Sequence, residues 1–558
     1  LENDGVATPP CDISLRVIPT IHGSRPRWFE TGVHFTPNCA ALPEGTAVEQ
    51  YVALYTATGC NVAHCPPSTL AAELGRRDVV RYMQPSGWLV NGCMIGKKPR
   101  PDSVKFQLAD GTYHANGTCP AAIYGREAYY HDRVEAPLRE IIVRDRMAEH
   151  IMANWEPFMF DFKGCFCHRC RRDFIAYTAL PSDYVHGLWP KRILDTHRDS
   201  WLDFRSWQNA HVIRTLEASV NAMGAEAGLD AHFVPEMHVK SITSLWDTSD
   251  SLRQYSTMAY ADRIPLINVW GPYPWQTVGT PYRYVRGYNL STHCLAKDAA
   301  EYIRDQIPME HRPRLIAFPH GLQGNKWTTE PESMAMDILS YFVHQWDGAI
   351  VYAFPKGYDA RYWAALARAN VAIAAFEEMV FSGTAQSKHK LEAVTPMPAP
   401  APAFLNAPCG GIDVPKWRDA GLIQSTEYRS GESRLFAVAN YWQRGESFFR
   451  LRIKGVPLGR KFVLREPLSG RCFADAEGNF GLTSGPLREG VLLHVGAQRF
   501  GFFVLEPVGS GHDYGVPVSS GAVAAVMEAR RTAIQAAYDA EPVTSRPVDY
   551  EGELKAFK

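Results

Sequence analysis

One glutamate and three cysteines, close together in the sequence, offer the clearest chemistry in this chain. Glu156 follows an apolar run from Ile151 to Trp155 and precedes Pro157. A short apolar run is typical of a buried strand, and the proline marks its end because proline cannot donate the next ladder hydrogen bond. The sequence therefore predicts a carboxylate at the tip of a buried strand.

The three cysteines follow with the spacing Cys165-x-Cys167-x-x-Cys170. Three thiolates so close in sequence can converge on one metal ion, and a fourth ligand would complete a tetrahedral site. Two upstream cysteines, Cys93 and Cys119, are candidates for that ligand, and reduced cysteines without a metal are the alternative. A closed site of four thiolates would be structural and would not activate water.

The bulk composition limits the classes of partner. The chain has 558 residues, of which 46% are apolar and 21% charged, so we expect more than one packed domain. A formal net charge of −1 gives no field that would attract nucleic acid or an anionic membrane. No apolar run approaches the length of a membrane span. We therefore expect neither nucleic acid nor membrane as a partner.

The cysteines and aromatic residues add two weaker indications. The 12 cysteines are scattered through a long chain, which favours a reducing, cytoplasmic location over a secreted or periplasmic one. The chain starts at Leu1, so a signal peptide or an upstream domain could be missing. The 14 Trp, 25 Tyr and 26 Phe would suit clefts that stack sugar rings as well as an ordinary core.

An alternation of strands and helices begins at Trp28. The apolar runs predict eight strands, at 28–35, 61–65, 87–90, 150–155, 231–236, 265–270, 314–318 and 349–354. Eight strands alternating with helices indicate an α/β fold, a (β/α)8 TIM barrel with long insertions after strands three and four.

The rest of the chain divides by composition into further segments. From about residue 407, short alternating runs separated by glycines predict a small C-terminal antiparallel β-sandwich. A proline-rich stretch before it reads as a stiff linker, and an alanine-rich tail as a helix. The predicted segments are an N-terminal arm or remnant of a preceding domain (1–26), the catalytic barrel (27–385), the linker (386–406), the sandwich (407–510) and the helical tail (511–558).

Carboxylates gather where the predicted barrel strands end. In TIM barrels the chemistry lies at the C-terminal ends of the strands. Glu156 and Asp161 follow strand four, Glu236 ends strand five, and Glu330 lies in the loop after strand seven. Two carboxylates that flank a glycosidic bond suffice to hydrolyse it. The alternative for Glu156 is a surface or capping acid, for Glu236 an ordinary loop start, and for the two loop acids a structural or idle role.

Polar and aromatic residues at the same ends could hold a sugar. Tryptophans after strands six and seven could stack on a sugar ring, and a histidine or an asparagine could bind its hydroxyl groups. Core packing is the alternative for the aromatic residues. The candidate substrate contacts are Asn154, Trp270, Trp275, His320 and Trp327.

Together these pieces resemble the glycoside hydrolase family 42 β-galactosidases and, more loosely, the clan of (β/α)8 retaining glycosidases. In that family strand four ends in Asn-Glu, and a Cys-x-Cys-x-x-Cys motif followed by Phe and Arg joins an upstream cysteine to bind zinc. The segments 201–207 and 339–354 resemble further parts of the family pattern, and the similarity covers roughly residues 28 to 375. The resemblance implies that Glu156 is the acid/base and that a structural zinc is bound by Cys119, Cys165, Cys167 and Cys170.

The chain also departs from that pattern. Trp155 rather than Asn precedes Glu156, and Asn154 lies one place earlier. The usual strand-seven glutamate, the nucleophile of the family, is replaced by Pro319-His320-Gly. Glu236, and after it Glu330, could supply the second carboxylate instead. The family's middle domain is absent, so a homo-oligomer is allowed but neither the trimer nor galactose specificity carries over.

The sequence thus favours a glycoside hydrolase that cleaves an oligo- or polysaccharide with two carboxylates. One alternative is a barrel that binds glycans through its tryptophans without hydrolysing them. Another is a metal-dependent hydrolase, whose ligands would be His34, His64, Glu236 and His238.

Overall fold

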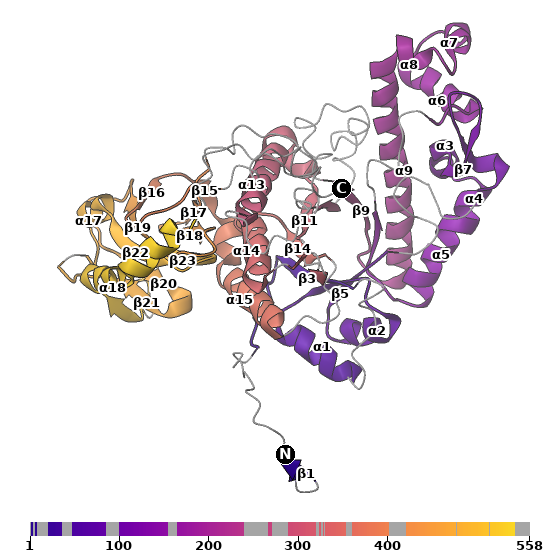
Figure 1. Ribbon diagram of the computed structural model, residues 1–558. Helices are drawn as coiled ribbons and strands as arrows, with labels where there is room; N and C mark the ends of the chain where they lie inside the picture. Colours follow the sequence, from indigo (N-terminus) through magenta and orange to yellow (C-terminus); the bar gives the residue numbers. More distant parts are fainter. Residues whose placement is uncertain are drawn as a thin grey trace.

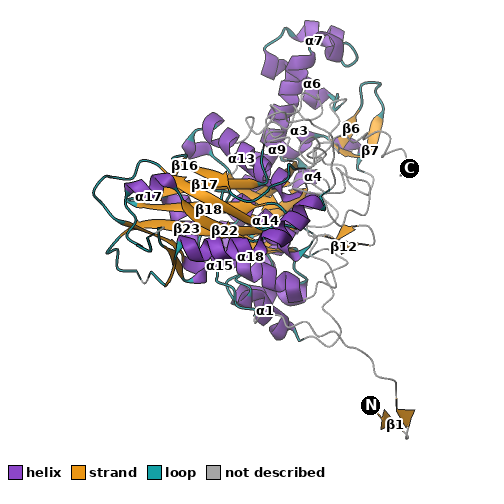
Figure 2. Cartoon of the chain, turned by 60° about the vertical axis from the view of Figure 1, so that its left-hand side comes forward, coloured by secondary structure: helices purple, strands orange, loops and turns teal. Residues whose placement is uncertain are grey.

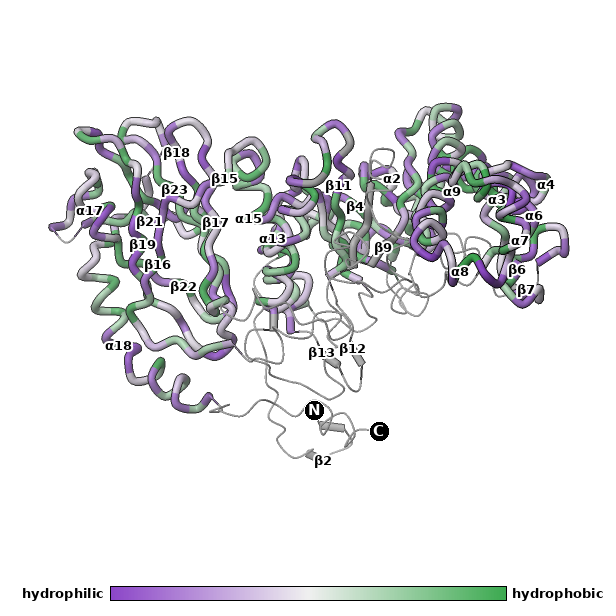
Figure 3. Tube along the Cα trace, turned by 90° about the horizontal axis from the view of Figure 1, so that it is seen from above, coloured by the Kyte–Doolittle hydropathy of each residue, from purple (hydrophilic) through white to green (hydrophobic). Residues whose placement is uncertain are grey.

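The structure, a computed structural model, describes residues 2–3, 6–7, 21–35, 47–84, 100–154, 164–238, 266–270, 288–319, 323–324, 327–328, 330–352, 360–400, 420–475, 477–512 and 514–541. Three bodies lie in a row, with the barrel between the C-terminal sandwich and a lobe formed by insertions (Figure 1). The same order is visible from above, where the sandwich and the lobe lie on opposite sides of the barrel (Figure 3).

Eight parallel strands form a closed barrel in the order β10-β11-β14-β3-β4-β5-β8-β9. Their bounds are β3 (Glu30–His34), β4 (Val62–His64), β5 (Val80–Met83), β8 (His150–Asn154), β9 (Phe233–His238), β10 (Leu266–Trp270), β11 (Arg314–Phe318) and β14 (Gly348–Val351). The predicted (β/α)8 fold is therefore confirmed, and seven of its eight strands lie where the apolar runs placed them.

The position predicted for the third barrel strand is wrong. The predicted strand at 87–90 lies outside the described residues, and the third barrel strand is β5, Val80–Met83. Arg81 breaks its apolar pattern, but this side chain pairs with Glu149 and donates from Nη1 to the carbonyl oxygen of Ala71 at 3.1 Å. A strand that contains a paired, buried arginine lacks the apolar run by which strands are recognised.

Helices cover the outside of the barrel between successive strands. The main ones are α1 (Val48–Ala57), α2 (Ser68–Arg76), α9 (Arg198–Ala227), α13 (Tyr288–Gln306), α14 (Pro331–Phe342) and α15 (Ala360–Ser382), with a short 3-10 turn at Met309–His311. The buried Glu377 of α15 accepts the backbone N–H groups of Arg27 and Trp28 at 2.7 and 2.9 Å. Helix α15, which follows the last barrel strand, thereby fixes the chain just before the first barrel strand.

The barrel interior is packed with side chains rather than open. It is filled by alternate residues of the strands, namely Val62, Tyr82, Met152, Val234, Ile316, Phe318 and Ile350. At the N-terminal end, the Tyr82 hydroxyl donates to Glu30, and Arg314 pairs with the same carboxylate at 2.8 Å. This ion pair occupies the N-terminal end of the barrel, whereas ligands of TIM barrels bind at the C-terminal end.

The insertion lobe, residues 100–148 and 164–230, comes from the long segments on either side of β8. Before β8 it contains η2 (Asp102–Val104), β6 (Lys105–Gln107), β7 (Tyr113–Thr118), α3 (Pro120–Tyr124) and a helical stretch made of α4 (Ala128–Tyr130), η3 (His131–Glu135), α5 (Ala136–Arg139) and η4 (Glu140–Arg144). After β8 it contains α6 (His168–Thr178), α7 (Ser182–Leu188), α8 (Ile193–Thr196) and the long helix α9. Helix α9 runs between the barrel and the rest of the lobe (Figure 1), and buried side chains therefore lie along its whole length.

The C-terminal part is a β-sandwich of a seven-stranded and a three-stranded sheet (Figure 2). The larger has the order β15-β17-β18-β23-β20-β21-β24 and the smaller β16-β19-β22, and every pair is antiparallel except β21 with β24. Their bounds are β15 (Thr384–Gln386), β16 (His389–Ala393), β17 (Ile423–Ser430), β18 (Ser433–Asn440), β19 (Ser447–Ile453), β20 (Phe462–Glu466), β21 (Arg471–Phe473), β22 (Val491–Val495), β23 (Arg499–Pro507) and β24 (Val516–Val518). Shorter helical pieces are η9 (Pro467–Ser469) and α17 (Ser484–Glu489), and α18 (Ser520–Asp539) lies in the predicted helical tail.

Two of these strands lie in segments that the sequence assigned to other parts. β15 straddles the expected end of the barrel at residue 385, and β16 lies in the expected linker 386–406. Each is an edge strand, pairing with β17 and β19 respectively. Because edge strands are short and polar, they carry little of the apolar alternation that marks a strand. Residues 384–393 therefore belong to the sandwich.

The sandwich packs directly on the barrel helices α13, α14 and α15. Phe376 of α15 stacks on Phe502 of β23, with ring centroids 4.8 Å apart. The Tyr441 hydroxyl lies 2.8 Å from Ser340 Oγ and 2.8 Å from His293 Nδ1, and all three groups are buried. The two domains thus share one core with hydrogen bonds inside it. Among the described residues, each helix is too short or too polar to cross a bilayer.

Candidate active site and metal centre

The C-terminal ends of β8 and β9 bring two candidate positions, 154 and 236, into register beside β10. Asn154 of β8 is the Cα partner of Glu236 of β9, and Glu236 in turn is the partner of Asn268 of β10. Position 236 lies two residues beyond Val234, whose side chain is part of the barrel interior. Because strand residues alternate between faces, position 236 belongs to the interior set.

The predicted site residues differ in how much the structure says of them. Glu156, Asp161, Trp275 and His320 lie outside the described residues. For Asn154, Glu236, Trp270 and Trp327 the backbone is placed, in β8, β9, β10 and the short strand β13 (Trp327–Thr328) that pairs with β12 (Gln323–Gly324). Glu330 is described in full. Their catalytic and substrate-binding roles remain predictions.

Glu330 holds the N-cap position of α14. Its carbonyl oxygen accepts the N–H of Met334 at 3.1 Å, and its side chain is exposed. A carboxylate at a helix N-terminus is stabilised by the partial positive charge of that end. Glu330 thus occupies the N-cap position, although its side chain makes no cap hydrogen bond.

Two histidines meet at the opposite wall of the barrel mouth. His34 ends β3 and His64 ends β4, and the two residues are Cα partners with ring centroids 4.2 Å apart. Burial lowers the pKa of His34 to about 4, and burial together with His34 lowers the pKa of His64 well below its usual value. Both imidazoles are therefore neutral at pH 7. The metal-dependent alternative would combine them with Glu236 and His238, whose side chains lie outside the described part of the structure.

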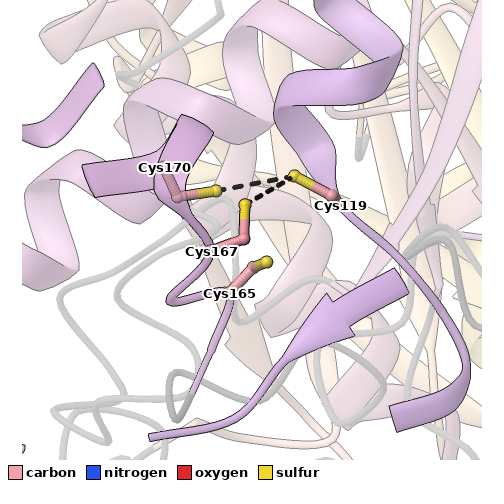
Figure 4. A group of neighbouring side chains, drawn as sticks. All are labelled: Cys119, Cys165, Cys167 and Cys170. Atoms are coloured by element: carbon pink, nitrogen blue, oxygen red, sulfur yellow. Dashed lines mark hydrogen bonds between the residues drawn. The ribbon is translucent and has the colours of Figure 1, made fainter. Parts of the chain in front are cut away.

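The four predicted metal ligands come together in the insertion lobe. The Sγ atoms of Cys119, Cys165, Cys167 and Cys170 all lie within 4.8 Å of one another, and all four residues are buried (Figure 4). Cys119 precedes α3, Cys167 caps α6, and Cys170 lies in the first turn of α6. This selects Cys119 as the fourth member; Cys93 lies outside the described residues.

The geometry fits a tetrahedral metal ion. The Sγ of Cys119 lies 3.4 Å from that of Cys167 and 3.7 Å from that of Cys170. Four sulfur atoms about 2.3 Å from a central zinc would be about 3.8 Å apart. All four ligands are thiols and the group is closed, so a bound ion would have a structural role.

The protonation of the four thiols supports the same conclusion. The neighbouring thiols Cys165 and Cys167 raise the pKa of Cys119, and burial raises the pKa of Cys170. Hydrogen bonds from Cys119, Cys165 and Cys170 lower the pKa of Cys167. One thiolate can thus be stabilised inside the group, but further negative charge requires a cation. A divalent ion would supply that charge.

Groups around the cluster donate to its sulfur atoms. Gln208 of α9 donates from Nε2 to the Sγ of Cys170 at 3.4 Å, and the backbone N–H of Gln107 lies 3.3 Å from the Sγ of Cys165. Gln208 also accepts a hydrogen bond from Arg205, which is fully buried and whose guanidinium lies over the rings of Phe106 and Trp201. The sequence analysis missed Gln107 and Gln208. The one available signal was the position of Gln208, which directly follows the segment 201–207 and lies one helical turn after Arg205.

The cluster brackets the strand that leads to Glu156. Cys119 lies before β8 in the chain, whereas Cys165, Cys167 and Cys170 lie after it. The segment returning from β8 is anchored again at Gly164, which bridges to Leu108, and at Phe166, whose N–H donates to the carbonyl oxygen of Gln107 at 2.8 Å. The described residues on either side of 155–163 are thus placed by the barrel, up to Asn154, and by the lobe with its cysteine cluster, from Gly164.

Comparisons with known proteins were made at three levels. No protein-family model and no curated protein sequence matches the chain. Similar solved structures include the β-galactosidase from Bacillus circulans sp. alkalophilus, with 8% identity, a TM-score of 0.49, and 86% of this chain and 99% of that chain covered. Another is Gan42B, a GH42 β-galactosidase from G. stearothermophilus, with 8% identity, a TM-score of 0.48, and 87% and 100% covered.

A third is the β-galactosidase from Rahnella sp. R3, with 13% identity, a TM-score of 0.42 and 66% of this chain covered. The matched part spans 58% of the length of that enzyme. Glycoside hydrolases of families 27, 30 and 36 are also among the similar structures. Because identities and TM-scores are this low, the likeness assigns neither a family nor an activity to this chain.

Proposed function

We propose that this chain is a glycoside hydrolase that cleaves an oligo- or polysaccharide. Glu156 acts as the general acid, and Glu236 is the second carboxylate. The observation that carries the proposal is the register of Asn154 with Glu236 on adjacent strands at the C-terminal end of a closed barrel. Glu156 follows Asn154 by two residues, so the two acids belong to neighbouring strand ends.

Two carboxylates on neighbouring strand ends can perform the whole reaction. One protonates the leaving oxygen, and the other either attacks the anomeric carbon or activates water. Glu330, exposed at the start of α14, is the second choice for that partner. Asp161 lies in the same segment, 155–163, as Glu156 and could assist it.

In this proposal, a zinc ion in the cysteine cluster would hold the segment that carries Glu156. The four thiolates would bind the ion, which would supply only structural cross-linking there. Cys165 follows Glu156 by nine residues, so the ion would be bound close in sequence to the proposed acid. The chemistry would remain with the carboxylates. The substrate would be neutral carbohydrate, in keeping with the net charge of −1.

Glycan binding without hydrolysis is the second candidate function. The observation that favours it is the absence of a glutamate at the tip of strand seven, where Phe318 is followed by Pro319 and His320. In that case the barrel would bind sugars through the same mouth but leave them intact.

The decisive experiment is a screen of the full chain against aryl glycosides and polysaccharides, followed by NMR of the first-formed anomer. Release of reducing sugar supports the hydrolase. Retention of configuration would indicate carboxyl groups about 5–5.5 Å apart, and inversion about 6.5–9.5 Å. Binding of oligosaccharides without any release would support the second candidate instead.

A further inference from the structure

The histidine pair at the barrel mouth is not used by the two-carboxylate mechanism. His34 and His64 are the last residues of β3 and β4, so both lie at the C-terminal end, where the carboxylates are expected. In the ring of eight strands, β3 lies four strands from β9 and is therefore directly across the mouth from Glu236. A sugar held between the two walls would meet the carboxylates on one side and the histidines on the other.

Three nitrogen atoms of this pair have no hydrogen-bond partner among the described residues. They are Nδ1 of His34 and both Nδ1 and Nε2 of His64. The side chains are nevertheless buried, with His34 8% exposed and His64 0% exposed. Buried polar atoms are almost always satisfied by protein, water or ligand, because leaving one unpaired is costly. Three of them side by side at a barrel mouth therefore point to a group that binds there.

The chemistry of the pair selects the kind of group. Both rings are neutral, so each offers one N–H donor and one acceptor nitrogen. A phosphate or carboxylate oxygen can only accept, so it would leave the acceptor nitrogen of each neutral ring unpaired. A metal ion would need a third ligand, and within the described residues only the cysteine cluster assembles three or more. A hydroxyl group, which both donates and accepts, matches a neutral imidazole on both counts.

The surroundings suit a sugar ring as well. The His34 ring lies 5.0 Å from the ring of Tyr352 and 6.1 Å from that of Phe318, centroid to centroid. Phe318 ends β11 and Tyr352 directly follows β14, so these rings line the same end of the barrel. Phe318 is buried in the barrel interior, whereas Tyr352 is only partly buried, so Tyr352 is the ring of the two that a sugar could contact.

We propose that His34 and His64 form one wall of the sugar site and hydrogen-bond hydroxyl groups of the sugar ring bound at the barrel mouth. The inference rests on the proposed function, because it takes this mouth as the carbohydrate site. His34 is 8% exposed and His64 is fully buried, so a hydroxyl group would reach the pair from the His34 side. The two histidines are binding residues and take no part in bond cleavage.

The test measures sugar binding and stability together, using the full chain. Galactose, glucose, mannose, xylose, arabinose and fucose are titrated by calorimetry, and each is added in thermal unfolding. His64→Leu and His34→Leu remove the nitrogen atoms at similar volume. His293→Leu is the matched control, because His293 is equally buried but is hydrogen-bonded to Tyr441 in the interface with the sandwich.

We expect His64→Leu and His34→Leu to weaken binding of the preferred sugar at least about 10-fold, which corresponds to the loss of roughly one to two hydrogen bonds. Their melting temperatures without sugar should be equal to or above that of the unmodified chain, because an unpaired buried polar group has been removed. His293→Leu should do the reverse, lowering the melting temperature and leaving sugar affinity unchanged.

Two results would overturn the inference. One is a His64→Leu variant that loses stability as His293→Leu does but binds sugar normally, which would mean that buried water or packing satisfies the histidine. The other is an unmodified chain that binds none of the six sugars. These results differ from a failure of the proposed function, because a chain that binds sugar through His64 yet cleaves no glycoside refutes only the hydrolase.

Discussion

Asn154 and Glu236 are Cα partners on the adjacent barrel strands β8 and β9. A one-residue change in the pairing of these strands would turn position 236 from the barrel interior towards the helices. The register is therefore what makes Glu236, rather than a neighbouring residue, a partner for an acid that follows Asn154.

The carboxylate pair gives the most direct prediction. Glu156→Gln and Glu236→Gln should each lower kcat/KM on an activated glycoside at least about 100-fold, as expected for loss of a general acid or its partner. Initial rates with aryl glycosides measure this. Glu528→Gln, on the exposed part of α18, is the control and should leave the rate unchanged.

If the Glu236 variant keeps full activity and Glu330→Gln loses it, Glu330 is the second carboxylate. Full activity in the Glu156 variant would remove the proposed acid altogether.

The cysteine cluster should contain one metal ion per chain. Cys119→Ser replaces one of four thiolates, so we expect the zinc content to fall well below one per chain and the melting temperature to fall with it. Mass spectrometry of the metal and thermal unfolding measure the two effects. Cys60→Ser, a buried cysteine that accepts from the Thr58 hydroxyl at 3.1 Å, should keep the metal. A metal-free unmodified protein would instead show that the four cysteines are simply reduced thiols.

Gln208 should tune the affinity of that cluster. Gln208→Leu removes the hydrogen bond to the Sγ of Cys170 and should weaken zinc binding by about 10- to 100-fold. Competition with a chromophoric chelator measures the affinity. Gln535→Leu, on the exposed face of α18, is the matched control. Equal affinities in the two variants would mean that Gln208 only packs beside the cluster.

Asp337 should make stability depend on pH. Burial raises the pKa of this carboxyl on α14 to about 7, against its usual 3.8, although Asn289 donates to it at 2.7 Å. The folded state therefore holds the proton more tightly than the unfolded state. The resulting stabilisation is complete below about pH 4 and is lost as the pH rises towards 7.

Asp337→Asn keeps an acceptor for Asn289 and cannot ionise, so its free energy of unfolding should not fall over that range. At pH 8 the variant should be more stable than the unmodified chain by as much as about 4 kcal/mol. Urea unfolding at pH 5 and pH 8 measures the difference. Asp183→Asn, at an exposed site on α7, should show none. An equal slope with pH in all three proteins would contradict the prediction.

The fold could be predicted where apolar runs are unbroken and could not where tertiary pairing replaces them. Strands such as Arg314–Phe318 are buried on both faces and read as continuous apolar segments. β5 escaped because Arg81 becomes acceptable only through Glu149, which lies 68 residues away. β17 lies within the predicted sandwich, although its run Ile423–Ser430 is polar and is stabilised by pairing with β15 and β18.

The candidate site shows the same difference between local signals in the sequence and features that depend on the tertiary structure. The spacing of Cys165, Cys167 and Cys170 is local, so it could be recognised in the sequence, and the family resemblance supplied Cys119. The register of Asn154 with Glu236 depends on how the barrel closes and has no local signal. The unpaired nitrogen atoms of His34 and His64 also have no local signal in the sequence. They become evident only when the strands β3 and β4 lie side by side.

The shared core of barrel and sandwich restricts how this chain can vary in evolution. Gln498 of the sandwich donates from Nε2 to Asn289 Oδ1 at 3.0 Å, beside the contacts of Tyr441. Recombination that exchanged the C-terminal domain for an unrelated one would leave α13 and α14 with apolar and polar groups facing water. We therefore expect the barrel and the sandwich to be inherited together. Accessory domains that are joined by flexible linkers are more easily exchanged.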